Sequence, residues 1–172
     1  FDYLIIASGS SYNVPIKEEG LIPAYRAKEL TLYHDNLHKS KKILIIGGGI
    51  VGVELAAEIC THFQDKDITL VHSNSELMKR NHKKSRKYAE YFLKKHDVKI
   101  IFGERVKNIE DKSKKYYITD KGTKINCDMT FICVGTKPNY EFMKKNFSFL
   151  LNERNQIKVN EFLQLPHYEN IF

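Results

Sequence analysis

Residues 41–58, which read KKILIIGGGIVGVELAAE, constrain the fold of this chain more than any other stretch. The run 43–46 is apolar and largely β-branched, which is typical of a strand buried on both faces. Gly47, Gly49 and Gly52 follow with the spacing G-x-G-x-x-G. From Val51 onward the apolar residues recur with a helical period. The stretch therefore predicts a buried strand, a tight glycine turn and a helix in immediate succession.

This order gives each of the three glycines a physical task. Gly47 permits the tight turn, Gly49 lets the pyrophosphate of a dinucleotide approach the backbone, and Gly52 lets the helix pack closely on the strand. The pyrophosphate would then lie at the helix N-terminus. The alternative is a glycine-rich turn that binds nothing, and the correct flanking strand and helix favour the binding site. The candidate cofactor-binding residues of this turn are Gly47, Gly48, Gly49, Ile50, Val51 and Gly52. Of these, the backbone amides of Gly49, Ile50 and Val51 should face the pyrophosphate.

Length and charge exclude some classes of protein and leave others open. The 172 residues are enough to bury a core and are close to the length of one domain. No apolar run approaches the roughly 18 residues that span a membrane, and the N-terminus does not resemble a signal peptide. The formal net charge of +7 comes from 23 lysines and 5 arginines spread along the chain. The densest basic cluster, residues 79–96, is typical of the solvated face of an amphipathic helix, so a nucleic-acid partner is the less favoured interpretation.

The cysteines and histidines form no recognisable metal or redox motif. Cys60, Cys127 and Cys133 contain no C-x-x-C pair, and the first and last lie in apolar stretches. They are expected to be core thiols in a protein of a reducing compartment. His34 and His38 have helical i, i+4 spacing but no evident third ligand, which favours a surface pair over a metal site. No residue in the sequence is a candidate catalytic nucleophile.

The rest of the sequence alternates predicted strands and helices, which indicates an α/β fold with a parallel sheet. The βαβ unit is completed by a strand at 68–72, and its crossover should be right-handed. Short alternating segments at 105–109, 116–119 and 123–126, with a turn at 120–122, predict a small antiparallel meander laid across that sheet. The remaining predictions are strands at 1–7, 98–102 and 129–134, helices at 23–38, 85–93 and 140–151, and strand fragments at 157–159 and 171–172.

Three motifs stand in a fixed order: FDYLIIASGS at 1–10, GGGIVGVELAAE at 47–58 and DMTFICVGTKPN at 128–139. This order resembles the pyridine nucleotide–disulfide oxidoreductase superfamily, the flavoproteins with two dinucleotide-binding domains. The closing stretch, IKVNEFLQLPHYENIF, is similar to the segment before that family's second FAD motif. The stretches GGGIVGVELAAEI, ITLVHSNSEL and ERVKNIED resemble the apoptosis-inducing-factor-like, ferroptosis-suppressor type of NAD(P)H:quinone reductase.

The resemblance implies a domain organisation and a function. Residues 1–22 would leave an FAD-binding domain, 23–134 would form a Rossmann-like NAD(P)H-binding domain, and 135–172 would return into the FAD-binding domain. The whole protein would pass hydride from NAD(P)H to FAD and on to a quinone or similar acceptor. The family's first FAD fingerprint would precede residue 1 and its second motif would follow residue 172. We therefore expect the chain to be part of a longer flavoprotein and to be inactive alone.

The resemblance also assigns candidate site residues outside the glycine turn. Val134 and Gly135 would close over the nicotinamide end of the cofactor, although a plain strand-to-loop turn is the alternative. Ser8 and Gly9 would belong to the FAD side. Glu54 would lie beside the nicotinamide carboxamide, unless it is only an acidic partner of the helix dipole.

The preference for NADH or NADPH depends on the end of the strand predicted at 68–72, where an acidic residue would bind the adenosine ribose of NADH. His72, Ser73 and Asn74 occupy that place, and no acid appears before Glu76. Together with His72, the cations Lys79 and Arg80 could accept a 2′-phosphate, unless His72 only bonds the ribose or faces solvent. We expect the two cofactors to be discriminated by less than about tenfold, or ~1.4 kcal/mol.

Two other classes of protein remain open from the sequence. One is a non-catalytic dinucleotide-binding module or a basic interaction surface for nucleic acid or protein. The other is a thioredoxin-reductase-like disulfide reductase, since its cysteines would lie in the FAD-binding domain. An intracellular location, cytoplasmic or mitochondria-associated, is expected, no metal is expected, and a homodimer is compatible with the sequence.

Overall fold

The computed structural model describes residues 1–12, 23–109 and 114–172. Internal contacts divide the chain into two compact units. One unit consists of 1–12 together with 136–172, and the other covers 13–135. Among the described residues, none of the helices combines the length and the apolar character needed to cross a membrane.

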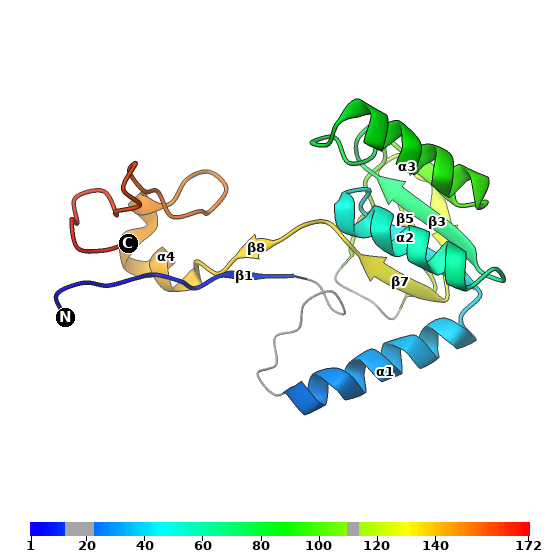
Figure 1. Cartoon of the computed structure of the whole chain (residues 1–172), viewed down its shortest axis with the longest axis horizontal. Helices are drawn as coiled ribbons and strands as arrows, with labels where there is room; N and C mark the ends of the chain where they lie inside the picture. The colour runs from blue at the N-terminus through cyan, green and yellow to red at the C-terminus, as the bar shows by residue number, and fades with distance from the viewer. Residues whose placement is uncertain (13–22, 110–113) are drawn as a thin grey trace. The chain divides into compact units, whose positions relative to one another are not determined.

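The larger unit is built on a four-stranded parallel sheet with the order β4-β3-β2-β7 (Figure 1). Its central strand β2, Lys42–Ile46, pairs with β3, Asp67–His72, on one side and with β7, Met129–Ile132, on the other. The edge strand β4, Lys99–Phe102, pairs with β3. Four consecutive residues of β2 are buried, which confirms the prediction of a strand covered on both faces.

Helices α2, Ile50–His62, and α3, Lys83–Lys95, cover one face of this sheet (Figure 1). Their apolar residues bury the odd-numbered side chains of β2, because alternate residues of a strand point to opposite faces. Ala56 and Ile59 of α2 and Leu93 of α3 are at most 2% exposed. This packing places the N-terminus of α2 at the carboxyl edge of the sheet, directly after the glycine turn.

The opposite face is covered by the antiparallel hairpin of β5, Tyr116–Ile118, and β6, Lys124–Asn126. Tyr117 and Ile125 pack on the even-numbered residues of β2. The strand predicted at 105–109 is wrong, since the segment pairs with the hairpin only through an isolated bridge from Val106 to Thr119 and the backbone hydrogen bonds on either side of it. Asn108 has a φ of +52°, a conformation through which a strand cannot continue.

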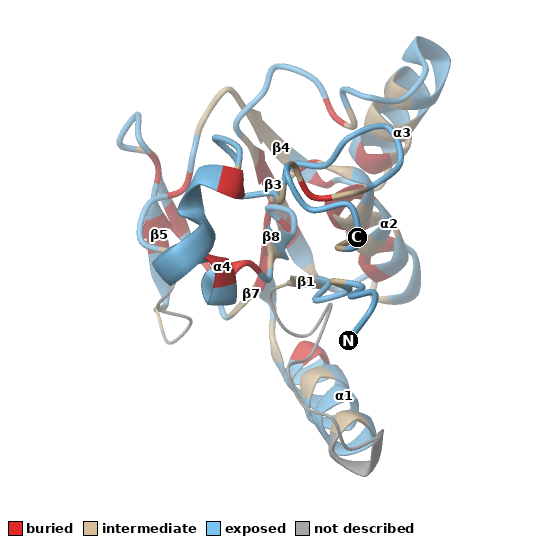
Figure 2. Ribbon diagram, turned by 90° about the vertical axis from the view of Figure 1, so that its left-hand side faces the viewer, coloured by how far each residue is buried: buried red, intermediate tan, exposed pale blue. Residues whose placement is uncertain are grey.

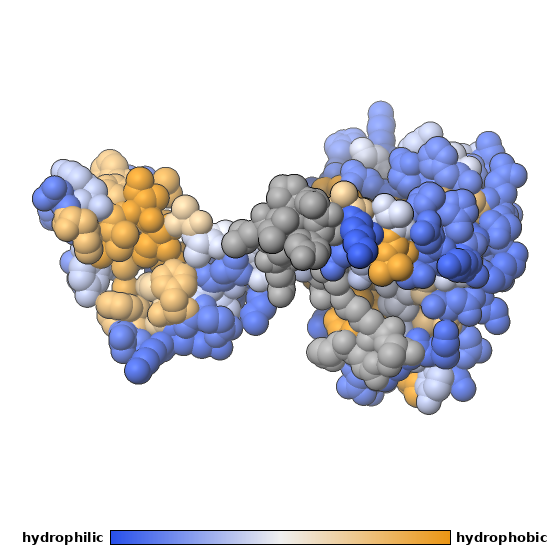
Figure 3. All heavy atoms as spheres, turned by 90° about the horizontal axis from the view of Figure 1, so that it is seen from below, coloured by the Kyte–Doolittle hydropathy of each residue, from blue (hydrophilic) through white to orange (hydrophobic). Residues whose placement is uncertain are grey.

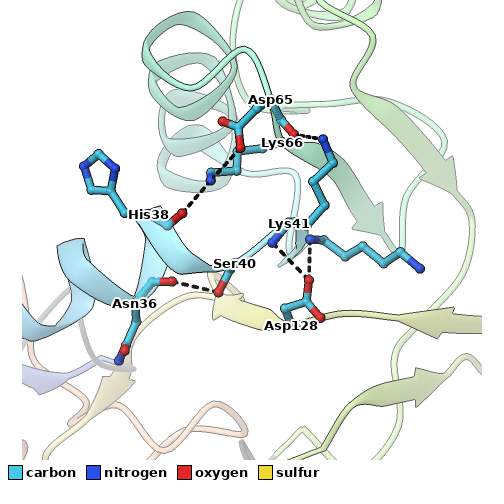
Figure 4. Close-up of polar contacts among 8 residues, drawn as sticks. Asn36, His38, Ser40, Lys41, Asp65, Lys66 and Asp128 are labelled. Atoms are coloured by element: carbon cyan, nitrogen blue, oxygen red, sulfur yellow. Dashed lines mark hydrogen bonds and ion pairs between the residues drawn. The ribbon is translucent and has the colours of Figure 1, made fainter.

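Helix α1, Pro23–Lys39, is largely exposed along its described length, and Leu37 near its end joins the core (Figure 2). Polar contacts hold that end (Figure 4). The amine of Lys66 donates to the carbonyl of His38 at 2.9 Å, and the side chain of Lys66 is only 3% exposed. The carboxylate of Asp128 accepts the backbone N–H groups of Lys41 and Lys42, at 3.0 and 2.7 Å.

The smaller unit contains the two-stranded pairing of β1, Ser10–Ser11, with β8, Lys137–Pro138. Helix α4, Glu141–Phe147, and the 3₁₀ turn η1, Ser148–Leu150, together replace the single helix predicted at 140–151. A small core forms from Met143, Leu150 and Leu165, with Ile6 and Ile171 packed against it. The fragments predicted at 157–159 and 171–172 form only one bridge each, at Ile157 and Ile171.

The strand predicted over residues 1–7 is also wrong. Only Leu4 forms a bridge, in parallel with Ile171, and three backbone hydrogen bonds with 170–172 accompany it. Phe1, Tyr3 and Ile5 are 72–89% exposed, so this face of the segment packs on no second layer within its unit. Figure 3 shows apolar side chains gathered on the surface of the same unit. The exposed apolar side chains of this unit include Phe149, Phe162 and Leu163, each at least 60% exposed.

Candidate functional site

The glycine turn at the carboxyl end of β2 fits its predicted geometry. Gly47 has a φ of +113°, which an L-amino acid with a side chain rarely adopts. A Cβ there would lie 2.4 Å from the carbonyl oxygen of Cys133. At Gly52 a Cβ would lie 1.8 Å from the carbonyl oxygen of Gly47, so the helix can pack here only without a side chain.

Gly49 differs from these two glycines because none of the described residues lies within 4 Å of its Cβ position. It is the N-cap residue of α2, with extended backbone, and no side chain caps the helix. The first turn of α2 contains no acidic residue. The first amide groups of α2 therefore have no side-chain acceptor and form an open helix N-terminus, which is the arrangement that binds phosphate groups. Ile50 beside it is half exposed, and Val51 is partly buried.

Gly48 is held from three directions. Its N–H donates to Nδ1 of His72 at 3.1 Å, and its carbonyl accepts the N–H of Met78 at 2.8 Å. A Cβ on Gly48 would lie 2.6 Å from Leu77 Cδ2 and 2.8 Å from His72 Cγ. The end of β3 and the loop after it are therefore packed directly against the glycine turn.

His72 is half-buried, and this position favours its neutral form. Nδ1 accepts a hydrogen bond, so it carries no proton, and the second ring nitrogen lies 3.4 Å from the side-chain amide of Asn74. Burial lowers the pKa of His72, and contact with the backbone of Glu76 partly offsets this effect. The geometry therefore does not favour a charge-assisted hydrogen bond from His72 to a 2′-phosphate, because that bond requires a protonated ring.

The loop after β3 presents polar and cationic side chains to solvent. Ser73, Lys79 and Arg80 are exposed. Glu76, the first acid after the strand, forms an ion pair with Arg86 of α3, which offsets its negative charge. Leu77 is 1% exposed and anchors the loop, a role that the sequence analysis missed. The sequence signal that could have indicated this role is that Leu77 is the single apolar residue in the polar run SNSEL at 73–77.

The end of β7 lies beside the glycine turn, because the Cβ position of Gly47 is 3.2 Å from the amide nitrogen of Val134. Val134 is exposed, and Gly135 has a φ of +103°, with no atom of the described part of the chain within 4 Å of a Cβ placed on it. Cys133 is buried, and burial raises the pKa of its thiol to about 11. The structure thus brings together the glycine turn, His72 and the 133–134 segment.

Glu54 is exposed in the second turn of α2. A helix dipole acts mainly on charges in the first turn, so that interpretation of Glu54 is weakened. Ser8 and Gly9 belong to the other unit. There they line an open hollow together with Thr136 and Asn139. Asn139, which the sequence analysis did not single out, donates to the carbonyl of Ser8 and to that of Gly9, at 2.8 and 3.0 Å.

The two histidines of α1 contact each other, with Nε2 atoms 3.2 Å apart, and both rings pack near Phe63. Across residues 1–12, 23–109 and 114–172, no three His, Cys, Asp or Glu side chains gather as a metal site. All three cysteines are buried free thiols, and burial raises the pKa of each.

The parallel sheet, the glycine turn and the open helix N-terminus define a Rossmann-like α/β protein. The chain belongs to the pyridine nucleotide-disulphide oxidoreductase family, which it matches over residues 1–172. It is 33% identical over 182 residues to mouse ferroptosis suppressor protein 1 and 34% identical over 200 residues to apoptosis-inducing factor homolog B of Dictyostelium discoideum. Both matches cover the whole chain, which spans about half of each relative, 48% and 50%.

Solved structures agree with this assignment. Reduced Bacillus anthracis CoADR-RHD has a TM-score of 0.74 at 26% identity, over all of this chain and 31% of that one. The water-forming NADH oxidase of Lactobacillus brevis, solved with NADH bound, also has a TM-score of 0.74, at 23% identity, over all of this chain and 38% of that one. The expected fold class and family are thus confirmed.

Proposed function

We propose that this chain is the NAD(P)H-binding portion of an FAD-dependent oxidoreductase. The observation that carries the proposal is the glycine turn, in which Gly47 and Gly52 are sterically obligatory, whereas none of the described residues lies within 4 Å of a Cβ placed on Gly49. Steric need explains the first two glycines without a ligand. It does not explain Gly49, whose missing side chain leaves open space at an uncapped helix N-terminus, where a pyrophosphate would lie.

The residues of this chain would bind and orient the dinucleotide. The amides of Gly49, Ile50 and Val51 would donate to the pyrophosphate, and Gly48 would hold the turn in place. The exposed Val134 and Gly135 would face the nicotinamide end, with Glu54 as a candidate partner for the carboxamide. When bound, nicotinamide and flavin supply the hydride-transfer chemistry, and the protein supplies binding and orientation.

We infer that the smaller unit contributes to the FAD-binding domain of the whole protein, with boundaries near 1–22, 23–134 and 135–172. Its exposed apolar side chains support this inference, because a surface with so many of them is usually covered by other protein. Ser8 and Gly9 would lie on the FAD side. A quinone or similar small molecule is the proposed acceptor, on the resemblance to the ferroptosis-suppressor branch, and a reducing, cytoplasmic or mitochondria-associated compartment fits the buried free thiols.

The proposal includes use of both NADH and NADPH, with less than about tenfold discrimination. No unpaired acid among the described residues of the 72–80 loop would repel a 2′-phosphate, since Glu76 is paired with Arg86. Lys79 and Arg80 are exposed and would attract it. Matched titrations that differ by about a hundredfold, or ~2.8 kcal/mol, would contradict this part of the proposal.

Calorimetric titration of the chain with NADH, NADPH and FAD at two salt concentrations tests the function. We expect both nicotinamide dinucleotides to bind with a modest dependence on salt, and FAD to bind weakly. A basic surface for nucleic acid would instead give DNA binding that collapses steeply with salt and no binding of NADH. A folded chain that binds none of the three would overturn the proposal.

A further inference from the structure

We propose that His72 is a positioning residue for the pyrophosphate-binding turn, acting through its neutral Nδ1 atom, and is not a ligand of the 2′-phosphate. The inference rests on the proposed dinucleotide site and adds a residue role and a pH dependence to it. Its basis is the placement of the His72 ring against Gly48.

The backbone of the glycine turn is bonded to the end of β3 and to the loop after it. The N–H of Gly47 donates to the carbonyl of Val71 and therefore continues the sheet. The N–H of Gly48 points instead to the ring of His72, and its carbonyl accepts from Met78. The peptide groups on both sides of Gly48 are thus fixed by the end of β3 and the loop that follows. The amides proposed to bind pyrophosphate begin at the next residue, Gly49.

The N–H of Gly48 has the ring of His72 as its acceptor. Gly48 is packed between His72 and Leu77, so there is no room for a side chain at position 48. A partly buried N–H that loses its partner is unfavourable, and the turn would shift to satisfy it. A shift of this peptide moves Gly49 and the start of α2, and both NADH and NADPH would lose affinity to the same extent.

The ionisable groups around the ring of His72 come from the loop after β3 and from the segment after β4. The glycine turn contributes no ionisable group. On the following loop, Glu76 is paired with Arg86 of α3, while Lys79 and Arg80 are exposed. After β4, the N–H of Glu104 donates to the carbonyl of His72, and its carboxylate accepts from Thr119. Protonation of His72 would remove the acceptor of Gly48, so acid should weaken binding.

The sign of the effect follows from burial. The pKa of His72 lies below its ordinary value of 6.5, chiefly because the ring is desolvated. The neutral form therefore predominates at neutral pH, and dinucleotide affinity should be constant there. The affinity should fall as the pH drops through the lowered pKa of His72.

Two variants of His72 test which of the two ring nitrogens is needed for binding. In His72→Asn, the side-chain oxygen can occupy the place of Nδ1 and accept from Gly48 without titrating. In His72→Gln, the longer side chain reaches toward the place of Nε2 and leaves Gly48 without its acceptor. Both variants are polar and uncharged, and thermal melting checks that each is folded.

The probe is NAD⁺, which is stable in mild acid and has no phosphate that titrates near pH 6. We expect NAD⁺ affinity of the unmodified chain to fall as the pH drops through the lowered pKa of His72, and that of His72→Asn to stay within about threefold of its pH 8 value over the same range. His72→Gln should lose about tenfold at pH 8, equally for NAD⁺ and NADP⁺, as expected for one lost hydrogen bond of ~1.4 kcal/mol. A loss confined to NADP⁺, or equal behaviour of the two variants, would overturn the proposal.

Nitrogen NMR of the imidazole in the dinucleotide-free chain separates this proposal from the proposed function. We expect Nδ1 to be unprotonated at pH 8 and the Gly48 amide to show coupling across the hydrogen bond. If the unmodified chain bound no NAD⁺ but this signature were present, the proposed function would fail and the acceptor role of His72 would stand. A protonated Nδ1 at pH 8 would refute that role, whatever the chain binds.

Discussion

A methyl group on Gly52 would lie 1.8 Å from the carbonyl oxygen of Gly47, five positions earlier in the sequence. The same position would also place it 3.3 Å from Cβ of Cys133. The helix that begins at Ile50 can therefore approach β2 and β7 only because Gly52 has no side chain. Because α2 packs this closely, its N-terminus faces the open space at Gly49.

Gly52→Ala should destabilise the chain by about 3 kcal/mol, the upper part of the range for overpacked sites, because the clash is with backbone. Gly49→Ala is the matched control. It has open space and ordinary backbone, so its stability should change by less than about 1 kcal/mol. Its added methyl group should nevertheless weaken NADH binding by about tenfold or more, ~1.4 kcal/mol. Chemical denaturation and calorimetric titration of both variants check these outcomes, and a Gly49→Ala variant with undiminished affinity would contradict the account.

Gly135→Leu should weaken dinucleotide binding while the domain remains folded. The φ of +103° makes any side chain strained, at about 1–3 kcal/mol, which a typical domain survives. Gly122→Leu in the β5–β6 hairpin is the control, since its φ of +87° imposes similar strain in similarly open space. Equal affinity of the two variants for NADH would favour the alternative, that residue 135 is only part of a strand-to-loop turn.

Asp128→Asn should lower the stability at pH 7 by about 1 kcal/mol, a value reduced for the exposure of the carboxylate. The pKa of Asp128 lies below its ordinary value of 3.8, because the carboxylate accepts from Lys42 and Lys41. A lowered pKa adds stability that is fully present above 3.8 and is lost as the pH falls through the folded-state value. Denaturation curves from pH 7 to pH 2 should therefore converge for the two proteins in acid. Asp67→Asn, an exposed carboxylate on β3, serves as the control.

Lys66→Met should cost about 2 kcal/mol, because it leaves the carbonyl of His38 without its donor at the end of α1. Most of the described side chains of α1 are exposed, so this contact, Leu37 and the packing of His34 and His38 near Phe63 carry much of its attachment (Figure 2). Amide hydrogen exchange should consequently accelerate in the last turns of α1. Lys99→Met, at an exposed lysine on β4, should leave the exchange unchanged. Equal exchange rates in the two variants would show that α1 is held by other contacts.

The parts of the fold that were predicted correctly depend on local patterns. The run of β2 and the glycine spacing predicted the strand, turn and helix, and the turn at 120–122 predicted the β5–β6 hairpin. These signals are local because each depends on residues fewer than about ten positions apart.

The failures depend on partners that lie far away in the sequence. The apolar residues at 1–7 read as a strand, yet only Leu4 forms a bridge, with a residue near the opposite end of the chain. The orientation of His72 toward Gly48 likewise depends on the burial of Leu77 and on the loop returning to the turn. The residue type at 72 suggested a cation for a phosphate, whereas its packed surroundings favour a neutral acceptor.

The most direct test of the central claim is amide NMR of the isotopically labelled chain during titration with NADH. If the glycine turn binds the dinucleotide, the largest shifts should occur at the amides of Gly49, Ile50 and Val51, followed by residues 72–80 and Gly135. Shifts concentrated on α3 or on residues 136–172, or an unchanged spectrum at saturating NADH, would contradict the assignment of this site.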